Sequence, residues 1–237
     1  MIGGTAAVLV WIAAAATAPA FQPETAMLRR LYEVALSRRQ REYGSADART
    51  AQAARDLGLF LYSAGDKPGA RRAMADAVRI DQNAFGAAAP RTLEDVATLA
   101  SVSPPVEAEP LLRRAAESPD ATVAGPALTS LAELRKATGD RAGAAALFRR
   151  ALEKAEIVDG KDGSTVALVL NMLALVVEPK EGVLLLGRAL AIDKAALGPS
   201  HPQTLGDVRK LAGLLRQTGR TSEATQLERQ FKAGSSH

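Results

Sequence analysis

The sequence predicts an all-α chain of stacked helix hairpins, and three observations predict it. First, a small residue, an apolar residue four positions on and an alanine three further return about every forty residues, a spacing that places them on one helix face. Second, aromatic residues are only 4% of the 237 residues and alanine dominates the apolar fraction, which suits closely packed helices. Third, glycine and proline separate the helical stretches. The full copies of the pattern are Ala70-Met74-Ala77 and Ala144-Phe148-Ala151, and the shortened copies are Leu111-Ala115 and Leu186-Ala189.

Glycine and proline set the expected helix ends. Glycine takes positive φ at little cost, proline cannot continue a helix, and threonine can cap the following helix through its hydroxyl. A six-residue interval from glycine to threonine occurs at 44–50, 86–92 and 198–204, and His201 in the last interval is expected to serve the turn. The expected helices are 24–43, 48–64, 67–85, 91–102, 106–117, 122–138, 141–158, 165–177, 180–197, 202–218 and 221–233.

These hairpins resemble the tetratricopeptide repeat (TPR). Two stretches match the consensus spacing closely: Leu57-Gly58, Leu61, Gly65, Ala70, Met74, Ala77, and Leu131-Ala132, Gly139, Ala144, Phe148, Ala151. The last junction, from Arg188 to Lys194 and then from Leu197 to Thr204, resembles the longer repeat of kinesin light chains and many bacterial proteins. The resemblance covers residues 27 to 233 and implies a right-handed superhelical solenoid. We therefore expect an N-terminal helix and about five hairpins in a repeat domain at 21–233, with a flexible tail at 234–237.

The N-terminus is typical of a signal peptide. Residues 1–22 carry no ionisable side chain, residues 6–16 are densely apolar, and Ala18-Pro19-Ala20 offers small residues where a signal peptidase cleaves. We predict a signal peptide at 1–20, cleavage near Ala20, and export to the periplasm or beyond. The alternative is a retained apolar helix, but the apolar stretch is shorter than the ~20 residues of a stable membrane span.

A longer period lies above the single hairpin. Leu57 and Leu131 are 74 positions apart, as are Leu99 and Leu173. Long and short hairpins therefore alternate. We interpret this as the duplication of a two-hairpin unit, now residues 48–117 and 122–191.

The charge pattern argues against nucleic acid as a partner. Thirty basic and 26 acidic residues are interleaved along the chain, for a net charge of +4. A nucleic-acid-binding protein more often gathers basic residues on one face with interleaved aromatics. We read these charges as solvated helix faces.

What the family resemblance implies is a concave groove that binds a protein or peptide partner. Asn171 can offer a donor and an acceptor to a peptide backbone, and Arg209 and Arg216 can pair with carboxylates. The alternatives are a solvated charge at each arginine and a packing role for Tyr62. The Lys/Asn pattern that clamps a C-terminal carboxylate in some family members is absent. The principal groove candidates are Gln52, Arg55, Tyr62, Glu133, Lys136, Asn171, Arg209 and Arg216, with Leu59, Glu94, Ser101, Thr129 and Leu175 beside them.

No pattern in the sequence points to catalysis. There is no cysteine, and neither His201 nor His237 has a metal-ligand partner at helical spacing. We expect no metal, no cofactor and no enzyme, and we predict a protein-interaction adaptor. The alternatives are self-association through the terminal hairpins, which the apolar run at 183–186 would suit, and, in third place, a small-ligand or enzymatic site.

Overall fold

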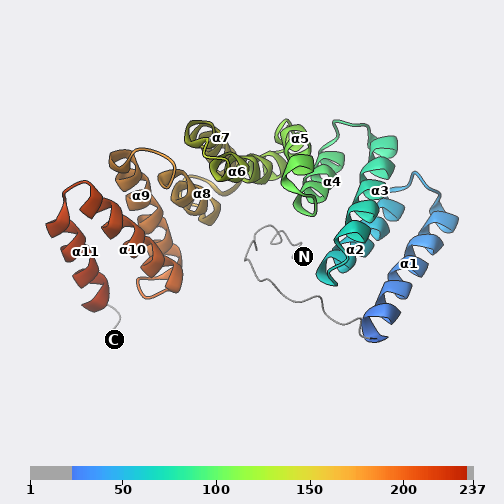
Figure 1. Cartoon of the computed structure of the whole chain (residues 1–237), viewed down its shortest axis with the longest axis horizontal. Helices are drawn as coiled ribbons and strands as arrows, with labels where there is room; N and C mark the ends of the chain where they lie inside the picture. Colours follow the sequence, from blue (N-terminus) through green and yellow to red (C-terminus); the bar gives the residue numbers. More distant parts are fainter. Residues whose placement is uncertain (1–22, 234–237) are drawn as a thin grey trace. The chain divides into compact units, whose positions relative to one another are not determined.

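The structure, a computed structural model, describes residues 23–233, and this part of the chain is entirely helices and short connections (Figure 1). The predicted signal peptide, its cleavage near Ala20 and the predicted tail at 234–237 lie outside the described residues. Contacts divide the chain into two compact units, which meet in sequence at Ser118 and Pro119. We describe each unit by itself and call them unit 1 and unit 2.

Unit 1 contains a single helix followed by two hairpins, α2–α3 and α4–α5. Unit 2 contains three hairpins, α6–α7, α8–α9 and α10–α11. The helices of unit 1 are α1 (Pro23–Tyr43), α2 (Ala48–Ser63), α3 (Lys67–Phe85), α4 (Pro90–Ser101) and α5 (Pro105–Ala116). Those of unit 2 are α6 (Ala121–Ala137), α7 (Arg141–Asp159), α8 (Ser164–Ala174), α9 (Pro179–Leu197), α10 (Pro202–Gln217) and α11 (Thr221–Ala233).

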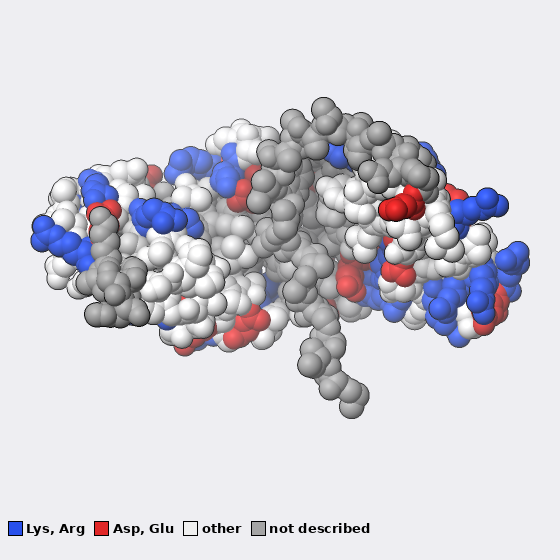
Figure 2. Space-filling model, turned by 90° about the horizontal axis from the view of Figure 1, so that it is seen from below, with Lys and Arg blue, Asp and Glu red and all other residues white. Residues whose placement is uncertain are grey.

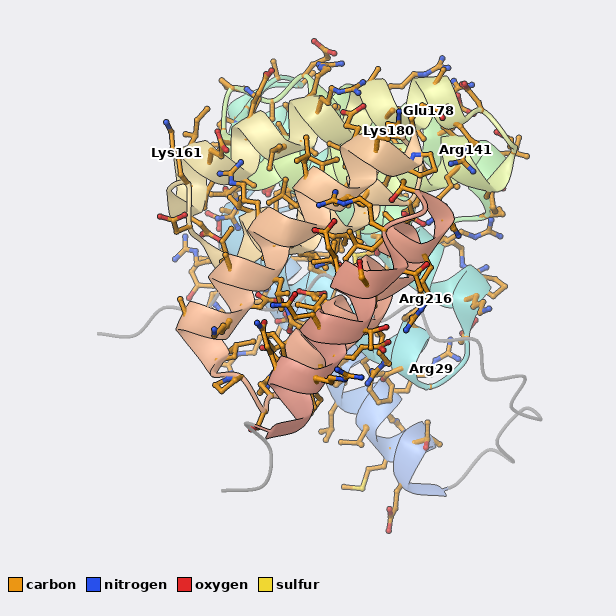
Figure 3. All side chains as sticks on the ribbon, turned by 90° about the vertical axis from the view of Figure 1, so that its left-hand side faces the viewer. Arg29, Arg141, Lys161, Glu178, Lys180 and Arg216 are labelled. Carbon is orange, nitrogen blue, oxygen red and sulfur yellow. The ribbon has the colours of Figure 1, made fainter. Side chains whose placement is uncertain are left out.

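The expected helix ends agree with the structure within one residue except at the end of α8. The sequence predicts a helix to residue 177, whereas α8 ends at Ala174. Arg141 of α7, labelled in Figure 3, donates to the carbonyl of Leu175 at 3.2 Å and to that of Val177 at 3.5 Å. A side chain from another helix thus satisfies carbonyls after the last turn of α8, and Pro179 starts the next helix.

The glycine stops are confirmed, but the expected role of threonine is wrong. Seven glycines that follow helices have φ between +74° and +90°. The helices after the six-residue intervals begin at the N-caps Asp47, Ala89 and His201. The threonines lie one turn further on and donate backward to the glycine carbonyls, at 2.8 Å for Thr50 and 2.9 Å for Thr92 and Thr204. Each threonine is fully buried, and its hydrogen bond links the first turn of its helix to the glycine that ends the preceding helix.

The repeated motif forms the interior of the hairpins. Met74 and Phe148 are completely buried, and so are the alanines that accompany them. In unit 1, Tyr32 of α1 stacks on Phe60 of α2 with ring centroids 5.0 Å apart, which closes the core at the first hairpin. In unit 2, Leu186 and Phe231 belong to a cluster shared by α8, α9, α10 and α11.

Contacts repeat at the 74-residue period. Arg114 of α5 donates to the Gln82 side chain and to the Ala87 carbonyl in unit 1. Arg188 of α9 makes the two corresponding bonds in unit 2, to Glu156 and to the Lys161 carbonyl. Asp66 and Asp140, also 74 positions apart, each accept a backbone N–H at 2.8 Å at the start of the next helix. These matches support the duplication.

Candidate functional site

The candidate residues lie on the first helix of each hairpin: α2 and α4 in unit 1, and α6, α8 and α10 in unit 2. The stripe predicted on α2 comprises Gln52, Arg55, Leu59 and Tyr62, which recur at helical spacing. The structure divides the candidates into side chains that are engaged within their own unit and side chains that stay exposed.

Gln52 and Arg55 are brought together on α2. The Arg55 Nη2 donates to the Gln52 Oε1 at 2.7 Å, and the Gln52 amide donates to Asp56 at 2.8 Å. The Arg55 side chain is only 12% exposed, because its Nη1 reaches inward to the Asp95 carboxylate at 2.6 Å. The structure thus gives the Arg55 guanidinium internal acceptors.

Leu59 and Tyr62 continue the stripe as exposed side chains. Leu59 is 53% exposed and Tyr62 is 41% exposed. Glu94 and Ser101 of α4 are exposed as well, although the Ser101 hydroxyl donates to a carbonyl of its own helix at 2.7 Å. Unit 1 thus offers apolar contact area together with one acidic side chain.

In unit 2, Glu133 and Lys136 form an ion pair on α6 with an N–O distance of 2.6 Å. Both are half-buried, so neither charge stands alone. Thr129, one turn earlier, is buried and donates to the Gly125 carbonyl at 3.0 Å. Leu175, the residue that follows α8, is 50% exposed.

Asn171 of α8 is joined to α10 by a lysine that the sequence analysis did not select. The Lys210 Nζ donates to the Asn171 Oδ1 at 2.7 Å, and it lies 3.4 Å from the Asp207 Oδ1. The Asn171 amide donates to the Ala167 carbonyl at 3.1 Å. Asn171 is 6% exposed, and its hydrogen-bond partners are other groups of unit 2.

The two candidate arginines of α10 differ. Arg216 pairs with Glu228 of α11 at 2.7 Å, and this carboxylate raises the pKa of Arg216 (Figure 3). Arg209 is exposed, and within residues 23–233 no side chain pairs with its guanidinium. Arg209 is therefore the candidate cation with its donors open to solvent.

Buried carboxylates behind the candidate surface have raised pKa values. Burial raises the pKa of Asp95 to about 7, while Arg55 opposes the rise and Asp81 adds to it. Burial also raises the pKa of Asp193, and hydrogen bonding to Asp207 adds to that rise. Electrostatics at the candidate surface thus depend on groups beneath it.

Sequence reasoning missed Lys210 and all four of these aspartates. The aspartates do have a signal in the sequence, because Asp81 and Asp95 are 14 positions apart and Asp193 and Asp207 have the same interval. In each pair the first aspartate follows an isoleucine and the second precedes a valine. No comparable signal marks Lys210, because its position opposite Asn171 depends on how α8 and α10 pack.

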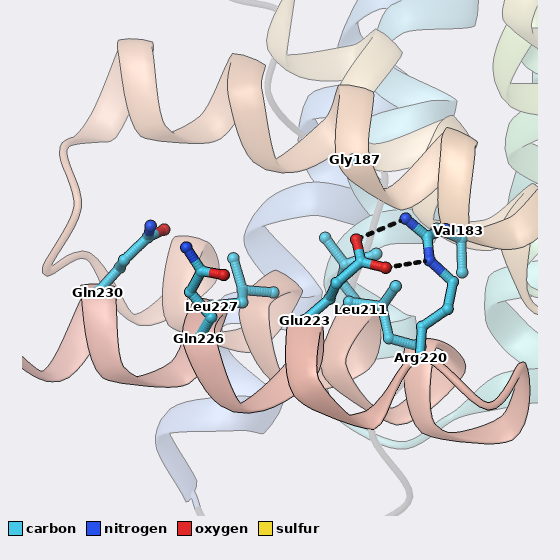
Figure 4. Close-up of a pocket in the computed structure, with 9 residues that line it drawn as sticks. Val183, Gly187, Leu211, Arg220, Glu223, Gln226, Leu227 and Gln230 are labelled. Carbon is cyan, nitrogen blue, oxygen red and sulfur yellow. Dashed lines mark hydrogen bonds and ion pairs between the residues drawn. The ribbon is translucent and has the colours of Figure 1, made fainter.

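One cavity of about 320 Å³ lies among α9, α10 and α11 of unit 2 (Figure 4). Val183, Leu211 and Leu227 form its apolar walls, and Gly187 leaves it open on the α9 side. The Arg220–Glu223 ion pair lies at its rim. This cavity is distinct from the predicted stripe.

The surface and helix composition add two observations. On the face in Figure 2, Lys and Arg side chains and Asp and Glu side chains are both present among uncharged residues. Within the described residues, no helix has the length and apolarity to cross a membrane, and no three potential ligands form a metal-binding cluster.

Comparisons with known proteins place this fold. A Tetratricopeptide repeat family model matches residues 50–90, which span α2, α3 and the start of α4. No curated protein sequence matches the chain. The crystal structure of BtubC (BKLC) from P. vanneervenii is similar over 90% of this chain and 91% of its own, with a TM-score of 0.71 and 16% identity.

Two further structures are similar. MamA has a TM-score of 0.54 and 15% identity over 76% of this chain and 89% of its own. TPR-like repeats of a Podosopora anserina protein named for kinesin light chains have a TM-score of 0.46 and 17% identity over 90% of this chain and 96% of their own. The all-helical, TPR-like solenoid fold predicted from the sequence is confirmed. Proteins of this fold generally act as scaffolds for protein interaction.

Proposed function

We propose that this protein is an interaction adaptor that holds an extended, acidic segment of a partner protein on the first helices of unit 2. Its action is recognition rather than catalysis. Arg209 carries the proposal, because it is exposed on α10 and no described side chain neutralises it. An uncompensated guanidinium can bind a carboxylate in two parallel hydrogen bonds.

Neighbouring groups suit an extended peptide. Asn171 and Lys210 join α8 to α10 through a 2.7 Å hydrogen bond, and either can exchange that partner for a peptide carbonyl or amide. Leu175 offers exposed apolar area just after the end of α8. The engaged states of Arg55 and Arg216 favour Arg209 over these two arginines as the contact that selects acidic residues.

Affinity capture with a matched charge reversal tests the proposal. Full-length wild type, Arg209→Glu and Arg229→Glu serve as baits, and bound proteins are identified by mass spectrometry. Arg229 is an exposed arginine on α11, so the control changes net charge equally on another helix. We expect a partner retained by the control and lost from the Arg209→Glu bait. Equal retention by both variants would contradict the proposal.

The proposed compartment is outside the cytoplasm, after removal of residues 1–20. This proposal rests on the apolar segment at 6–16 and the small residues up to Ala20. Sequencing the N-terminus of the mature protein tests it. A mature chain that still begins at Met1 would contradict cleavage.

Self-association is a second candidate, which one observation favours. Met27, Leu28, Leu31 and Val34 of α1 are each between 47% and 67% exposed, on consecutive turns of one helix. Within the predicted apolar run, by contrast, Val183 and Leu186 are buried. Light scattering across protein concentrations tests this candidate: Leu31→Ser should lower a concentration-dependent mass, and the control Leu184→Ser, at a 73% exposed site of α9, should not.

A further inference from the structure

Four buried carboxyl oxygens lack a hydrogen-bond partner within the described residues. They are the Asp81 Oδ1, the Asp95 Oδ2, the Asp193 Oδ1 and the Asp207 Oδ2. All four side chains are at most 1% exposed. A buried carboxylate oxygen without a donor is costly, so these atoms require an explanation.

The four oxygens belong to two equivalent pairs. In each pair one aspartate lies one turn before the end of the second helix of a hairpin, and the other lies on the first helix of the next hairpin. The two carboxyl groups of each pair affect one another, because Asp81 adds to the raised pKa of Asp95 and Asp207 adds to the raised pKa of Asp193. A proton on one carboxyl group turns one of its oxygens into a donor, and the ionised carboxyl group of the pair is an acceptor of matching chemistry, so one shared proton can account for two orphaned oxygens.

The two pairs differ in their cations. In unit 1, the Arg55 Nη1 lies 2.6 Å from Asp95 and the Arg91 Nε lies 2.7 Å from Asp81. Two guanidinium groups thus face two carboxyl groups. With both aspartates ionised, this pair is electrically balanced.

In unit 2, a neutral amide replaces one of these cations. The Gln203 Nε2 donates to the Asp193 Oδ2 at 2.8 Å, from the position on α10 that Arg91 occupies on α4. The one cation at this pair is Lys210, whose Nζ is 3.4 Å from the Asp207 Oδ1. With both aspartates ionised, one negative charge would be buried without compensation.

Two other charged or titratable groups on the adjoining elements have contacts away from the pair, and Arg209 of α10 is exposed to solvent. Lys194 of α9 lies over the Phe231 ring of α11, 5.7 Å from its centroid. The His201 Nδ1 accepts the Gln203 backbone N–H at 3.2 Å. On α8, the polar group near the pair is the neutral Asn171, which Lys210 contacts.

The position of Lys210 gives an independent indication. Its ammonium group is closer to the neutral Asn171 oxygen, at 2.7 Å, than to the Asp207 carboxyl oxygen, at 3.4 Å. A fully ionised aspartate pair would attract the ammonium group more strongly than an amide does. The observed distances fit a pair that carries one negative charge rather than two.

We propose that Asp193 and Asp207 share one proton in the folded protein at neutral pH, and that this proton keeps Lys210 on Asn171. Loss of the proton to solvent leaves two carboxylates and draws Lys210 toward Asp207. The Asn171 oxygen is then free to accept a hydrogen bond from a bound peptide. This last step rests on the function proposed above and makes that site pH-sensitive.

Carboxyl NMR of the full chain tests the shared proton directly. Aspartate ¹³Cγ signals are followed from pH 4 to 10 in wild type and in Asp207→Asn. In wild type we expect one carboxyl of the pair to stay protonated through pH 7. In Asp207→Asn the amide at 207 donates to Asp193, so Asp193 should be ionised above pH 5. Titration of both aspartates below pH 5 in wild type would overturn the proposal.

The Asn171 side-chain amide reports on the link to Lys210. In wild type its ¹H–¹⁵N cross-peaks should move with the midpoint of the aspartate pair, whereas in Asp207→Asn they should not move above pH 5. Cross-peaks that ignore the titration of the pair would overturn the link. Because no partner is present, failure here leaves the capture result for Arg209 unaffected.

A matched substitution in unit 1 should have the opposite effect on stability. At pH 8, Asp207→Asn should leave the melting temperature unchanged or raise it, because the amide replaces the shared proton. Asp95→Asn should lower it by about 5 °C or more, because Arg55 loses its buried carboxylate. An equal fall in both variants would count against the proposal. Gln203→Arg adds the missing cation and should move the midpoint of the unit 2 pair below pH 7, and an unchanged midpoint would contradict the charge-balance argument.

Discussion

Unit 1 and unit 2 make the same contacts at their turns. They differ in the charged side chains that contact their buried aspartates. Arg114 and Arg188 make corresponding pairs of hydrogen bonds 74 residues apart. The aspartate pairs lie at equivalent helix positions, but the pair in unit 1 contacts Arg55 and Arg91, whereas the pair in unit 2 contacts Lys210 and the neutral Gln203.

The comparison shows that the repeat fold requires the hydrogen bonds at its turns but permits different charged partners for its buried aspartates. Every hairpin must satisfy the carbonyls at its turns, since an unpaired buried backbone group costs free energy wherever it occurs. A buried carboxyl pair has two solutions, because a second cation or a shared proton can neutralise it. Repeats with one backbone can therefore respond differently to pH.

The largest expected loss of stability comes from placing a charge in the core of each unit at equivalent positions. Leu57→Asp and Leu131→Asp replace leucines that are 8% and 5% exposed and 74 positions apart. Each variant buries a charge without a partner, which should cost more than about 3 kcal/mol. Hydrogen exchange should show lost protection in α2 and α3 for the first variant and in α6 and α7 for the second. Unchanged protection would mean that these helices do not pack as described.

The pH dependence of stability sharpens the comparison. Burial raises the pKa of Asp95 to about 7 from an ordinary value of 3.8, so the folded state holds a proton that the unfolded state releases across this range. The free energy of unfolding of unit 1 should fall as pH rises from about 4 to about 7 and then level off. Burial also raises the pKa of Asp193, so unit 2 should likewise lose stability as pH rises, and because its pair has one cation the loss should extend to higher pH than in unit 1. Urea midpoints measured by hydrogen exchange for each unit test this, and identical profiles would contradict the assigned difference in charge.

Arg91→Gln converts the unit 1 pair to the composition of unit 2. It removes an ion pair of 2.7 Å to the fully buried Asp81, whose arginine is 39% exposed. We expect a loss of about 1–3 kcal/mol at pH 8, smaller at pH 5, where a proton can take the place of the cation. Chemical unfolding at the two pH values measures it. The exposed control Arg79→Gln should change stability by less than about 0.5 kcal/mol.

The smallest expected loss of stability comes from removing a hydrogen bond between a buried threonine and the preceding glycine carbonyl. Thr92→Val removes a buried 2.9 Å hydrogen bond to the Gly86 carbonyl and should cost about 1 kcal/mol. Unit 2 already has Val166 at the equivalent place, and there Asp159 accepts the Thr165 N–H at 3.1 Å. Val166→Thr should therefore have little effect. A thermal melt of each variant distinguishes the two sites. An equal fall in melting temperature would show that the threonine hydrogen bond is not specific to the loop at Gly86.

Much of the fold could be predicted from the sequence because its signals are local. Glycine φ angles, proline starts and the alanine stripe act within one or two turns, so the helix ends agree closely. One error arose where a distant side chain intervened, and the other where a local hydrogen bond ran in the opposite direction along the chain from the one expected. Arg141 reaches the carbonyls that follow α8, and the threonines bond backward to glycine instead of capping the next helix.

The candidate site was less accessible to sequence reasoning. Spacing placed Arg55 and Arg209 at equivalent positions, but it could not show that Asp95 engages one of them while the other stays exposed. Partners 39 or 40 residues away in the chain decide whether a charge is available to a ligand.

The sequence by itself determined an all-helical repeat, because backbone conformation and helix amphipathicity follow from residues a few positions apart. The tertiary structure decided which polar groups are buried, which cation faces each aspartate pair, and that Lys210 meets Asn171. These outcomes depend on packing between helices, where burial removes water and leaves each charge to the few groups within a few ångströms.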